Sequence, residues 1–468
     1  MRETSHPLEI LLAVSRDEPG TLARQVETQL RNAIREGALR PGTRLPSTRA
    51  LADQLGVSRR VSVEAYAQLG AEGYVELRQG ASPRVSATTP TAADPSPVTA
   101  AASTPTARYD FRPSRPDVTT FPRPAWGRYL RDAARSIRTA DLLYGDPCGV
   151  EEFRSAVADY LGRVRGVVAT PERVVATGGY LQGLGLVCQA MAARGARTIA
   201  LEDPCSSEEP QIAARAGLDV LRLPVDSEGA RTDLLPTLDP NVVVLTPAHQ
   251  HPIGVVLSPR RRRVLAQWLT HSDAVLVEDD YDSEYRFDRP AVGAVQGISP
   301  ERVIYAGTLS KVLAPALRLG WMVVPGWLLG DVRTQKQLAD QGSPRIEQLA
   351  FARFLEDGHL DRHLRAMRTL YRSRRDTVVN ALAAEVPEAT IGGIAAGLHV
   401  TAALPSHYDE RAIQAAALAR GVALAVLGDY TPQATFPPTL ILGYPQLTGC
   451  AITLGVAQIA AAIRTSSR

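Results

Sequence analysis

The chain has 468 residues, with 52 Lys and Arg against 49 Asp and Glu, and 45% of its residues are hydrophobic. This length suits about three domains of roughly 150 residues, and the apolar fraction excludes a wholly disordered protein. A formal charge of +3 is too small to indicate nucleic-acid binding by itself. Only Lys311 and Lys336 are lysines, so the other 50 basic residues are arginines, which cannot form a Schiff base.

Apolar runs and cysteines point to a soluble protein inside the cell. No stretch approaches the roughly 18 apolar residues of a membrane span, and the run LEILLAV near the start is too short. The four cysteines lie far apart, without the spacing of a zinc site or a disulfide framework. We therefore expect reduced thiols, no membrane contact and a cytoplasmic location.

Residues 15–85 are predicted to form a small helical module. Apolar residues recur every four positions from Leu22 to Ile34, which predicts a helix that ends near Gly37. Residues 74–78 and 84–85 are predicted to pair as a small hairpin, or wing, around Gly80.

Between that first helix and the hairpin the sequence has a helix-turn-helix pattern. Ser47 can cap one helix and Ser58 the next, with Gly56 in the turn between them. In such a motif the N-terminal part of the second helix reaches the major groove of DNA. We expect four side chains to be exposed there: Ser58, Arg59, Arg60 and Ser62. The module has 11 arginines against eight acidic residues, a weak excess that also suits a helical docking domain.

This stretch resembles the winged helix of GntR-type bacterial regulators. The similarity covers about residues 20–85 and includes the elements LPS-x-R, LADQLGVSR, AYAQL and EGY in that order. It implies that operator DNA is the partner and that the wing near Gly80 enters the minor groove. It also implies contacts to phosphates or base edges from Arg49, Ser58, Arg59 and Arg60.

Residues 86–108 are predicted to be a linker. They are rich in Ala, Thr, Ser and Pro, contain four prolines, and are typical of a semi-stiff connection. The C-terminal body that follows alternates short apolar runs with amphipathic stretches, at 173–177, 197–202, 241–246, 274–279 and 302–307. This rhythm predicts an α/β fold with a mostly parallel sheet over 109–336 and a smaller α+β domain over 337–468.

Several strand ends in the body carry reactive side chains. Lys311 follows the strand at 302–307, and Thr308, Ser310 and Arg318 nearby can bind a phosphate. Taken alone, Ser-Lys also suits an ordinary surface lysine. Strand parity places Asp279 on one face with Val275 and Val277, where it can hold a protonated pyridine nitrogen, and Tyr281 can donate to an oxygen on the ring. Upstream, the glycines of ATGGYLQGL precede a helix start, where backbone N–H groups can bind phosphate.

In this order the elements resemble the fold-type-I aminotransferase body of MocR-type regulators, a branch of the GntR group. The resemblance runs from about Tyr109 to the C-terminus and includes FPRPAW, EDDYDSEY and GHLDRHLRAMRTLYRSRRD. It implies pyridoxal phosphate (PLP) as cofactor and a homodimer in which Tyr144 reaches the partner subunit. It also implies cofactor contacts from Lys311, Asp279 rather than Asp280, Tyr281, Gly179, Tyr180, Thr308 and Arg318.

Three departures from the family pattern stand out. Ser206 occupies the position of an aromatic residue that stacks on the cofactor. His251 and Ile253 stand where Phe and Thr or Ser are usual. Ile441 replaces an arginine that clamps the substrate carboxylate, a bond worth roughly 1.5–3 kcal/mol. A nearby arginine could take over that contact.

We therefore interpret the chain as a PLP-binding transcriptional regulator at the bacterial nucleoid. Its effector is PLP itself or PLP with a small amine or amino acid, and such members of the family control vitamin B6 synthesis. The alternatives are an active aminotransferase and a regulator whose body only dimerises. His249 with His251, and His359 with His363, lack a third ligand at suitable spacing, so we expect no metal. Nothing in the sequence explains Lys336.

Overall fold

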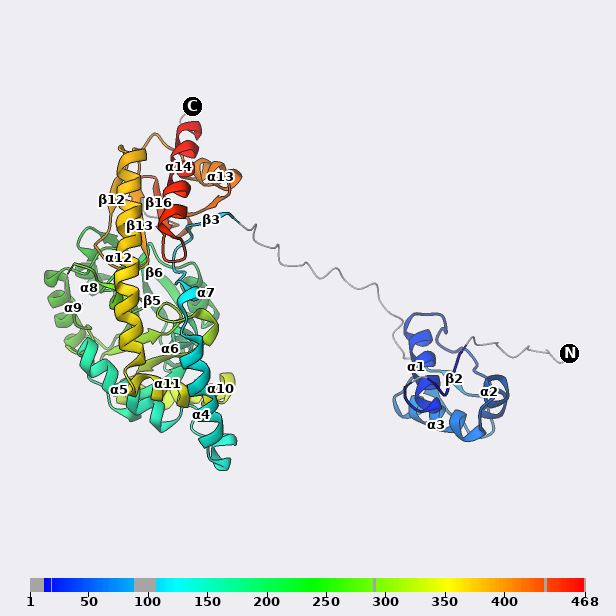
Figure 1. Ribbon diagram of the computed structural model, residues 1–468. Coiled ribbons are helices and arrows are strands. Elements are labelled where there is room, and N and C mark those ends of the chain that lie inside the picture. The colour runs from blue at the N-terminus through cyan, green and yellow to red at the C-terminus, as the bar shows by residue number, and fades with distance from the viewer. Residues whose placement is uncertain (1–11, 18, 88–106, 289–291, 433–435, 467–468) are drawn as a thin grey trace. The chain divides into compact units, whose positions relative to one another are not determined.

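The computed structural model describes residues 12–17, 19–87, 107–288, 292–432 and 436–466 (Figure 1). The chain divides into two compact units, residues 1–105 and 106–468, each described by itself below. Most of the predicted linker, residues 88–106, lies outside the described residues.

The first unit is a three-helix module with a two-stranded wing, as the sequence predicted. Ser47 caps the second helix by accepting a hydrogen bond from the Ala50 N–H, and Gly56 ends that helix at φ +64°. The wing strands pair antiparallel. The elements are α1 (Leu22–Arg35), α2 (Thr48–Leu55), α3 (Arg59–Ala71), β1 (Val75–Glu76) and β2 (Arg84–Val85).

One prediction about α3 is wrong. Ser62 is fully buried, whereas we expected it to be exposed. It lies three, four and seven residues before Ala65, Tyr66 and Leu69, which are buried too, so it belongs to the inward stripe of the helix. Its hydroxyl has no hydrogen-bond partner among the described residues.

The second unit is built on an eight-stranded sheet in the order β4-β11-β10-β9-β8-β5-β6-β7. The strands β10, β9, β8, β5 and β6 pair parallel, and the five predicted strands are all present. The edge strands β4 and β7 pair antiparallel with their neighbours. The strands are β4 (Val174–Thr177), β5 (Thr198–Asp203), β6 (Asp219–Asp226), β7 (Gly229–Ala230), β8 (Val242–Leu245), β9 (Val275–Asp279), β10 (Val303–Thr308) and β11 (Gly320–Val323).

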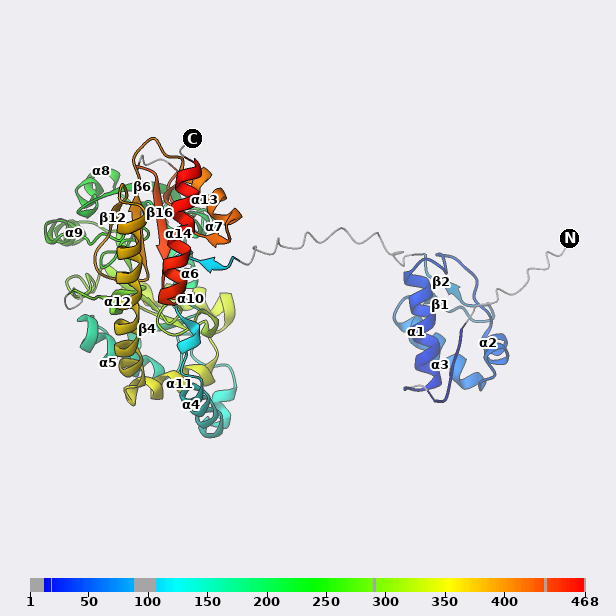
Figure 2. The same ribbon diagram turned by 45° about the horizontal axis from the view of Figure 1, so that its top comes forward.

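Helices cover both faces of this sheet (Figure 2). On β9, Val275 and Val277 pack on one face with α6, α7 and α10, and Leu276 packs on the other face with α8 and α9. This arrangement is the three-layer α/β fold that the alternation predicted. The helices are α4 (Arg123–Ser136), α5 (Glu151–Arg165), α6 (Tyr180–Ala193), α7 (Glu208–Arg215), α8 (Leu235–Leu238), α9 (Pro259–His271), α10 (Gly326–Asp340) and α11 (Arg345–Glu356).

A smaller antiparallel sheet in the order β12-β13-β16-β15 forms the C-terminal part of this unit. The segment after the linker also reaches this part of the unit, because β3 (Tyr109–Asp110) pairs with β14 (Val422–Ala423) in a separate two-stranded parallel sheet. The remaining elements are α12 (His359–Glu385), β12 (Thr390–Gly392), β13 (His399–Ala403), α13 (Glu410–Ala419), β15 (Ala425–Val426), β16 (Thr439–Gly443) and α14 (Gly449–Ser466).

By length and composition alone, α14 is apolar enough to cross a membrane. In both views it lies beside α12 (Figures 1 and 2), and α12 and α13 contact it. Its buried stripe of Ile452, Val456, Ile459 and Ile463 belongs to the main hydrophobic core. The helix therefore packs here as a core helix.

Candidate functional site

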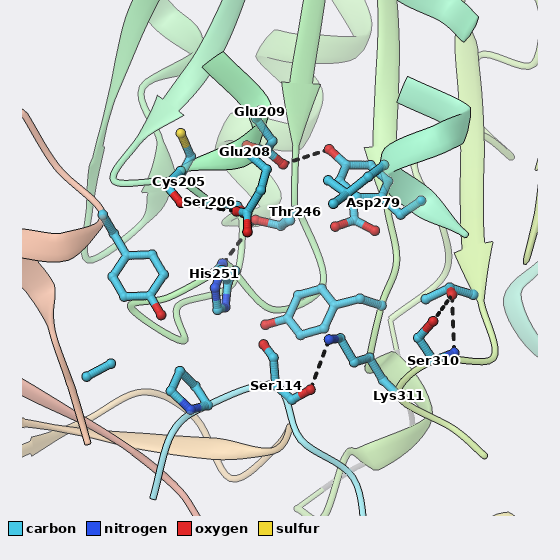
Figure 3. A pocket seen from close by; sticks show the side chains of 18 of the residues that line it. Ser114, Cys205, Ser206, Glu208, Glu209, Thr246, His251, Asp279, Ser310 and Lys311 are labelled. Carbon is cyan, nitrogen blue, oxygen red and sulfur yellow. Dashed lines mark hydrogen bonds between the residues drawn. The ribbon is translucent and has the colours of Figure 1, made fainter. Parts of the chain in front are cut away.

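A cavity of about 600 Å³ lies where β8, β9 and β10 end (Figure 3). Parallel strands bring their carboxyl ends to one edge of a sheet, where α/β proteins commonly bind ligands. The lining includes the predicted residues Lys311, Asp279, Tyr281, Gly179, Tyr180, Thr308, Ser310 and Arg318. Residues 112–115, which follow β3 and are called the strap below, close another side of the cavity.

Lys311 carries the reactive amine of the cavity. Its Nζ donates a 2.9 Å hydrogen bond to the Ser114 carbonyl of the strap (Figure 3). Burial lowers the pKa of Lys311, although the nearby carboxylates of Asp279 and Asp282 oppose that shift. A lowered pKa favours the neutral amine, which is the form that attacks a carbonyl.

Asp279 and Asp280 are adjacent but have different surroundings. Asp279 lines the cavity, and its Oδ1 has no hydrogen-bond partner among the described residues. Burial, with nearby carboxylates, raises the pKa of Asp279 well above its usual value. Asp280 instead accepts hydrogen bonds of 2.7 Å each from the Arg165 guanidinium and the Tyr305 hydroxyl. The other Asp280 oxygen, Oδ1, is also without a partner among the described residues, but Asp280 does not line the cavity. Of the two, Asp279 is therefore the one that can offer a carboxylate oxygen to a ligand there.

Tyr281 stands at one end of a buried polar chain. Its hydroxyl lies 3.2 Å from His249 Nδ1, which in turn lies 2.9 Å from Asp282 Oδ2. Burial raises the pKa of Tyr281 well above its usual value, so its hydroxyl keeps its proton at neutral pH. A protonated phenol is a hydrogen-bond donor to an oxygen on a ligand.

The start of α6 forms a cradle with Arg318. Gly179 precedes the helix at φ +114°, and a Cβ there would lie 3.4 Å from two guanidinium nitrogens of Arg318. Thr308 donates a 3.0 Å hydrogen bond to Ser310 beside it. Backbone N–H groups at a helix start together with an arginine suit a phosphate. The Tyr180 hydroxyl is not free for a phosphate, because it donates to Glu209 at 2.7 Å.

These groups fit PLP. The amine of Lys311 matches its aldehyde, the unpaired carboxylate oxygen of Asp279 matches a pyridine N–H, and the glycine–arginine cradle matches its phosphate. The fit depends on the cavity residues themselves and on their hydrogen bonds.

The three departures from the expected pattern also have definite surroundings. Ser206 lines the cavity and donates a 2.5 Å hydrogen bond to Glu208, so a polar pair replaces the expected aromatic ring. The His251 ring lies edge-on to Tyr281 and Tyr430, and burial lowers its pKa well below the usual value, so it is neutral.

The position of the expected carboxylate clamp is apolar. Ile441 is fully buried in a cluster with Ala425 and Leu427. Two arginines of the strap, Arg112 and Arg115, line the cavity instead. Both pair with Asp110, at 2.6 Å and 2.8 Å, so two positive charges face one negative charge.

Sequence reasoning missed several cavity residues. Glu202 and Glu209 are buried in its wall, and burial raises their pKa values to about 8 and about 7. Glu202 is the penultimate residue of β5, and Glu209 lies in the first turn of α7, which comes next, so their place near a strand end was the signal available. The strap residues carried no such signal, because β3 brings them to the cavity by pairing with the distant β14.

Tyr144 does not line the cavity of its own chain. Its side chain is 87% exposed, and Leu142 and Leu143 beside it are 62% and 71% exposed. Three consecutive exposed large apolar residues suit an interface with another chain.

The first unit presents the predicted DNA-binding residues on its surface. Arg49, Ser58, Arg59 and Arg60 are exposed, and none of the three arginines forms an ion pair with a described residue. Gly80 is exposed at φ +79°, a conformation that favours glycine in the wing turn.

The paired histidines have other neighbours. His249 contacts Asp282 and Tyr281, and His363 lies 3.2 Å from the Val312 carbonyl. Within the described ranges, no group of three or more His, Cys, Asp or Glu side chains is arranged to hold a metal ion.

Comparison with known proteins agrees with this division. Residues 22–85 match the family of bacterial regulatory proteins of the gntR type. Residues 117–428 match the family of class I and II aminotransferases. The Pyrococcus horikoshii kynurenine aminotransferase has the same fold, with a TM-score of 0.70 and 24% identity over 78% of this chain and 92% of that one.

Three relatives resemble most of the chain. The HTH-type transcriptional regulator YhdI of Bacillus subtilis is 33% identical, over 94% of this chain and 95% of its own length. The HTH-type pyridoxine biosynthesis transcriptional regulator PdxR of Corynebacterium glutamicum is 32% identical, over 83% and 84%. The probable rhizopine catabolism regulatory protein MocR of Rhizobium meliloti is 32% identical, over 93% and 92%. The chain therefore belongs to the MocR-type branch of the GntR family, DNA-binding transcriptional regulators with an aminotransferase-like, PLP-binding domain.

Proposed function

We propose that PLP in the cavity controls how the winged helix binds operator DNA, and that the aminotransferase-like domain serves as a sensor. The observation that carries this proposal is the combination of a fitted cofactor cavity with a buried Ile441 where a substrate clamp is expected. PLP itself, or PLP with an amine ligand, is the effector. The PdxR relative is named for pyridoxine biosynthesis, which supports control of vitamin B6 synthesis as the pathway.

In this proposal each cavity residue has one task. When bound, PLP supplies an aldehyde that combines reversibly with amines. Lys311 would hold it through its amine, Asp279 would keep the proton on the pyridine nitrogen, and Tyr281 would donate to the 3-oxygen. The phosphate would lie among the N–H groups of Gly179 and Tyr180, the Thr308 hydroxyl and the Arg318 guanidinium.

The regulator would act as a homodimer at the nucleoid, in the cytoplasm. Arg49, Ser58, Arg59, Arg60 and the wing at Gly80 would contact operator DNA, with affinity from phosphate neutralisation. Leu142, Leu143 and Tyr144 would face the partner subunit, where Tyr144 would reach the second cavity; their exposure supports this. Effector binding can shift the positions of two winged helices only through a difference in affinity between two states.

The test measures operator affinity of fully stripped protein with and without PLP. Operator fragments are first selected from genomic DNA by their binding to the full chain. We expect PLP to change the dissociation constant of the operator complex. We also expect bound PLP to give a visible absorbance that differs from that of free PLP and that Lys311→Ala abolishes. Unchanged operator affinity would exclude PLP as the signal. Multiple turnovers with an amino-acid panel and an oxo-acid acceptor would support the rival function, an active aminotransferase.

A further inference from the structure

Lys336 is the second lysine of the chain, and the cofactor contacts proposed above do not use it. It lies on α10, and its side chain is fully buried. Its Nζ donates three hydrogen bonds: to Asp340 at 2.6 Å, to Ser343 at 2.9 Å and to Gln182 at 3.2 Å. A buried ammonium is costly unless it is paired and hydrogen-bonded, and all three protons of this one have acceptors.

Gln182 connects this buried lysine with the cradle. Its Oε1 accepts the bond from Lys336 and also a 2.6 Å bond from the backbone N–H of Gly178. Its Nε2 donates to Asp340 at 2.7 Å. Both ends of the Gln182 amide are therefore engaged, so the side chain has a single orientation. Gly178 and the next residue, Gly179, form the turn that leads into α6.

The pair formed by Lys336 and Asp340 also balances charge close to the cradle. Burial tends to raise the pKa of Asp340, but bonds from Lys336, the Gly342 N–H and Gln182 outweigh that effect and keep the pKa below its usual value. Without the ammonium, Asp340 would lose its ion pair and Gln182 Oε1 the bond from Nζ, so the orientation of the Gln182 amide would no longer be fixed from this side.

The geometry also accounts for a lysine in a chain that otherwise uses arginine. A compact ammonium directs three donors to acceptors on different sides, whereas a guanidinium is planar and larger. An arginine at position 336 would have to fit its fork into space that the lysine fills without any exposure.

We propose that Lys336 is a positioning residue for the phosphate cradle, acting through Gln182 on the turn at Gly178 and Gly179. This inference depends on the proposed function, because it assumes that the cradle receives the phosphate of PLP. It predicts that the network affects ligands with a phosphate group and leaves those without one nearly unaffected.

The test compares the binding of PLP with that of pyridoxal, which lacks the phosphate, by titrating absorbance of the full-length protein. The variants are Lys336→Met, Gln182→Ala and the double variant. Arg333→Met is the control, since Arg333 is a half-exposed basic residue on the same helix. We expect Lys336→Met to weaken PLP binding about tenfold, the effect of roughly one buried hydrogen bond, while pyridoxal affinity and the control change little.

The double variant tests the route. If Lys336 acts through Gln182, the double variant loses no more PLP affinity than Gln182→Ala alone. Equal losses for PLP and pyridoxal, or additive losses in the double variant, would overturn the inference. Should Lys336→Met not fold, Gln182→Ala keeps the buried ion pair and must show the phosphate-selective loss by itself. If wild-type protein gives no absorbance with PLP, the proposed function fails first, and the inference with it.

Discussion

The adjacent carboxylates Asp279 and Asp280 allow a sharp test, because we expect the same substitution to change the free energy of unfolding at one position and hardly at the other. We expect Asp280→Asn to destabilise the protein and Asp279→Asn to leave its stability nearly unchanged. The side chains of Asp280 and Arg165 are 1% and 2% exposed, and their charged groups are 2.7 Å apart. Removing one partner of such a buried pair leaves the other charge without compensation, which costs about 3–5 kcal/mol.

The Asp279 carboxylate has no such ion pair within the part of the chain that the structure describes. Its Oδ1 makes no hydrogen bond with a described residue, and burial raises its pKa well above the usual value. A raised acid pKa means that stability present at low pH is lost as the pH rises through the folded-state pKa. Replacing Asp279 with the neutral amide removes that loss. Its free energy of unfolding at neutral pH should therefore be higher than that of wild type or within about 1 kcal/mol of it.

The assay is urea unfolding of full-length, PLP-free protein followed by tryptophan fluorescence. All four tryptophans lie in the second unit, so the fluorescence reports unfolding of that unit and not of the winged helix; they are Trp126, Trp268, Trp321 and Trp327. Equal destabilisation by the two substitutions would refute the distinction. The two variants should also differ when PLP is added. Asp279→Asn should alter the absorbance of bound PLP, whereas the folded fraction of Asp280→Asn should retain the wild-type absorbance.

Three further outcomes are expected. Burial raises the pKa of Glu202 to about 8, so the free energy of unfolding of wild type should fall as the pH rises from about 5 to about 9. In urea unfolding, Glu202→Gln should make this dependence on pH less steep. An unchanged dependence on pH would contradict the burial argument. Arg59→Gln should make the plot of log binding constant against log salt concentration less steep by roughly 0.9, so that the loss of operator affinity between 50 and 200 mM salt shrinks by a factor of about 3.5. Arg24→Gln on α1 is the control and should leave the slope unchanged. An unaltered slope in Arg59→Gln would exclude Arg59 from the phosphate contacts. Arg115→Gln should weaken binding of amines that carry a carboxylate about tenfold and spare alkylamines of equal length, measured by absorbance; equal effects on both would exclude Arg115 as an acid-binding residue.

Much of the architecture could be predicted because its causes are local. The wing, the Ser47 cap and four of the five parallel strands depend on turn residues and apolar periodicity, which a single sequence displays directly. Ser58 precedes α3 without a side-chain cap hydrogen bond, the parallel strand β6 was not predicted, and the predicted strand β4 pairs antiparallel. Strand ends were equally informative, since Asp279 is the last residue of β9, Lys311 follows β10, and both line the cavity. The roles given to them as cofactor contacts remain predictions.

The remainder needed tertiary structure. Arg115 lies at the cavity only because β3 pairs with a strand more than 300 residues later. Lys336 acquires its partners from α6, α10 and the turn after α10. Ser62 was misplaced because a polar residue suggested an exposed position, although its helical spacing to Leu69 placed it on the inward face.

The scarcity of lysine has a practical consequence for chemical labelling. Because Lys336 is fully buried, Lys311 is the lysine of this chain that small amine-directed reagents can reach. The other amine open to such reagents is an α-amino group, which lies on a different peptide. Its position in the cavity means that any occupant competes with the reagent. Acylation followed by mass spectrometry would therefore report cavity occupancy from the one peptide that contains Lys311, without a background from other lysines.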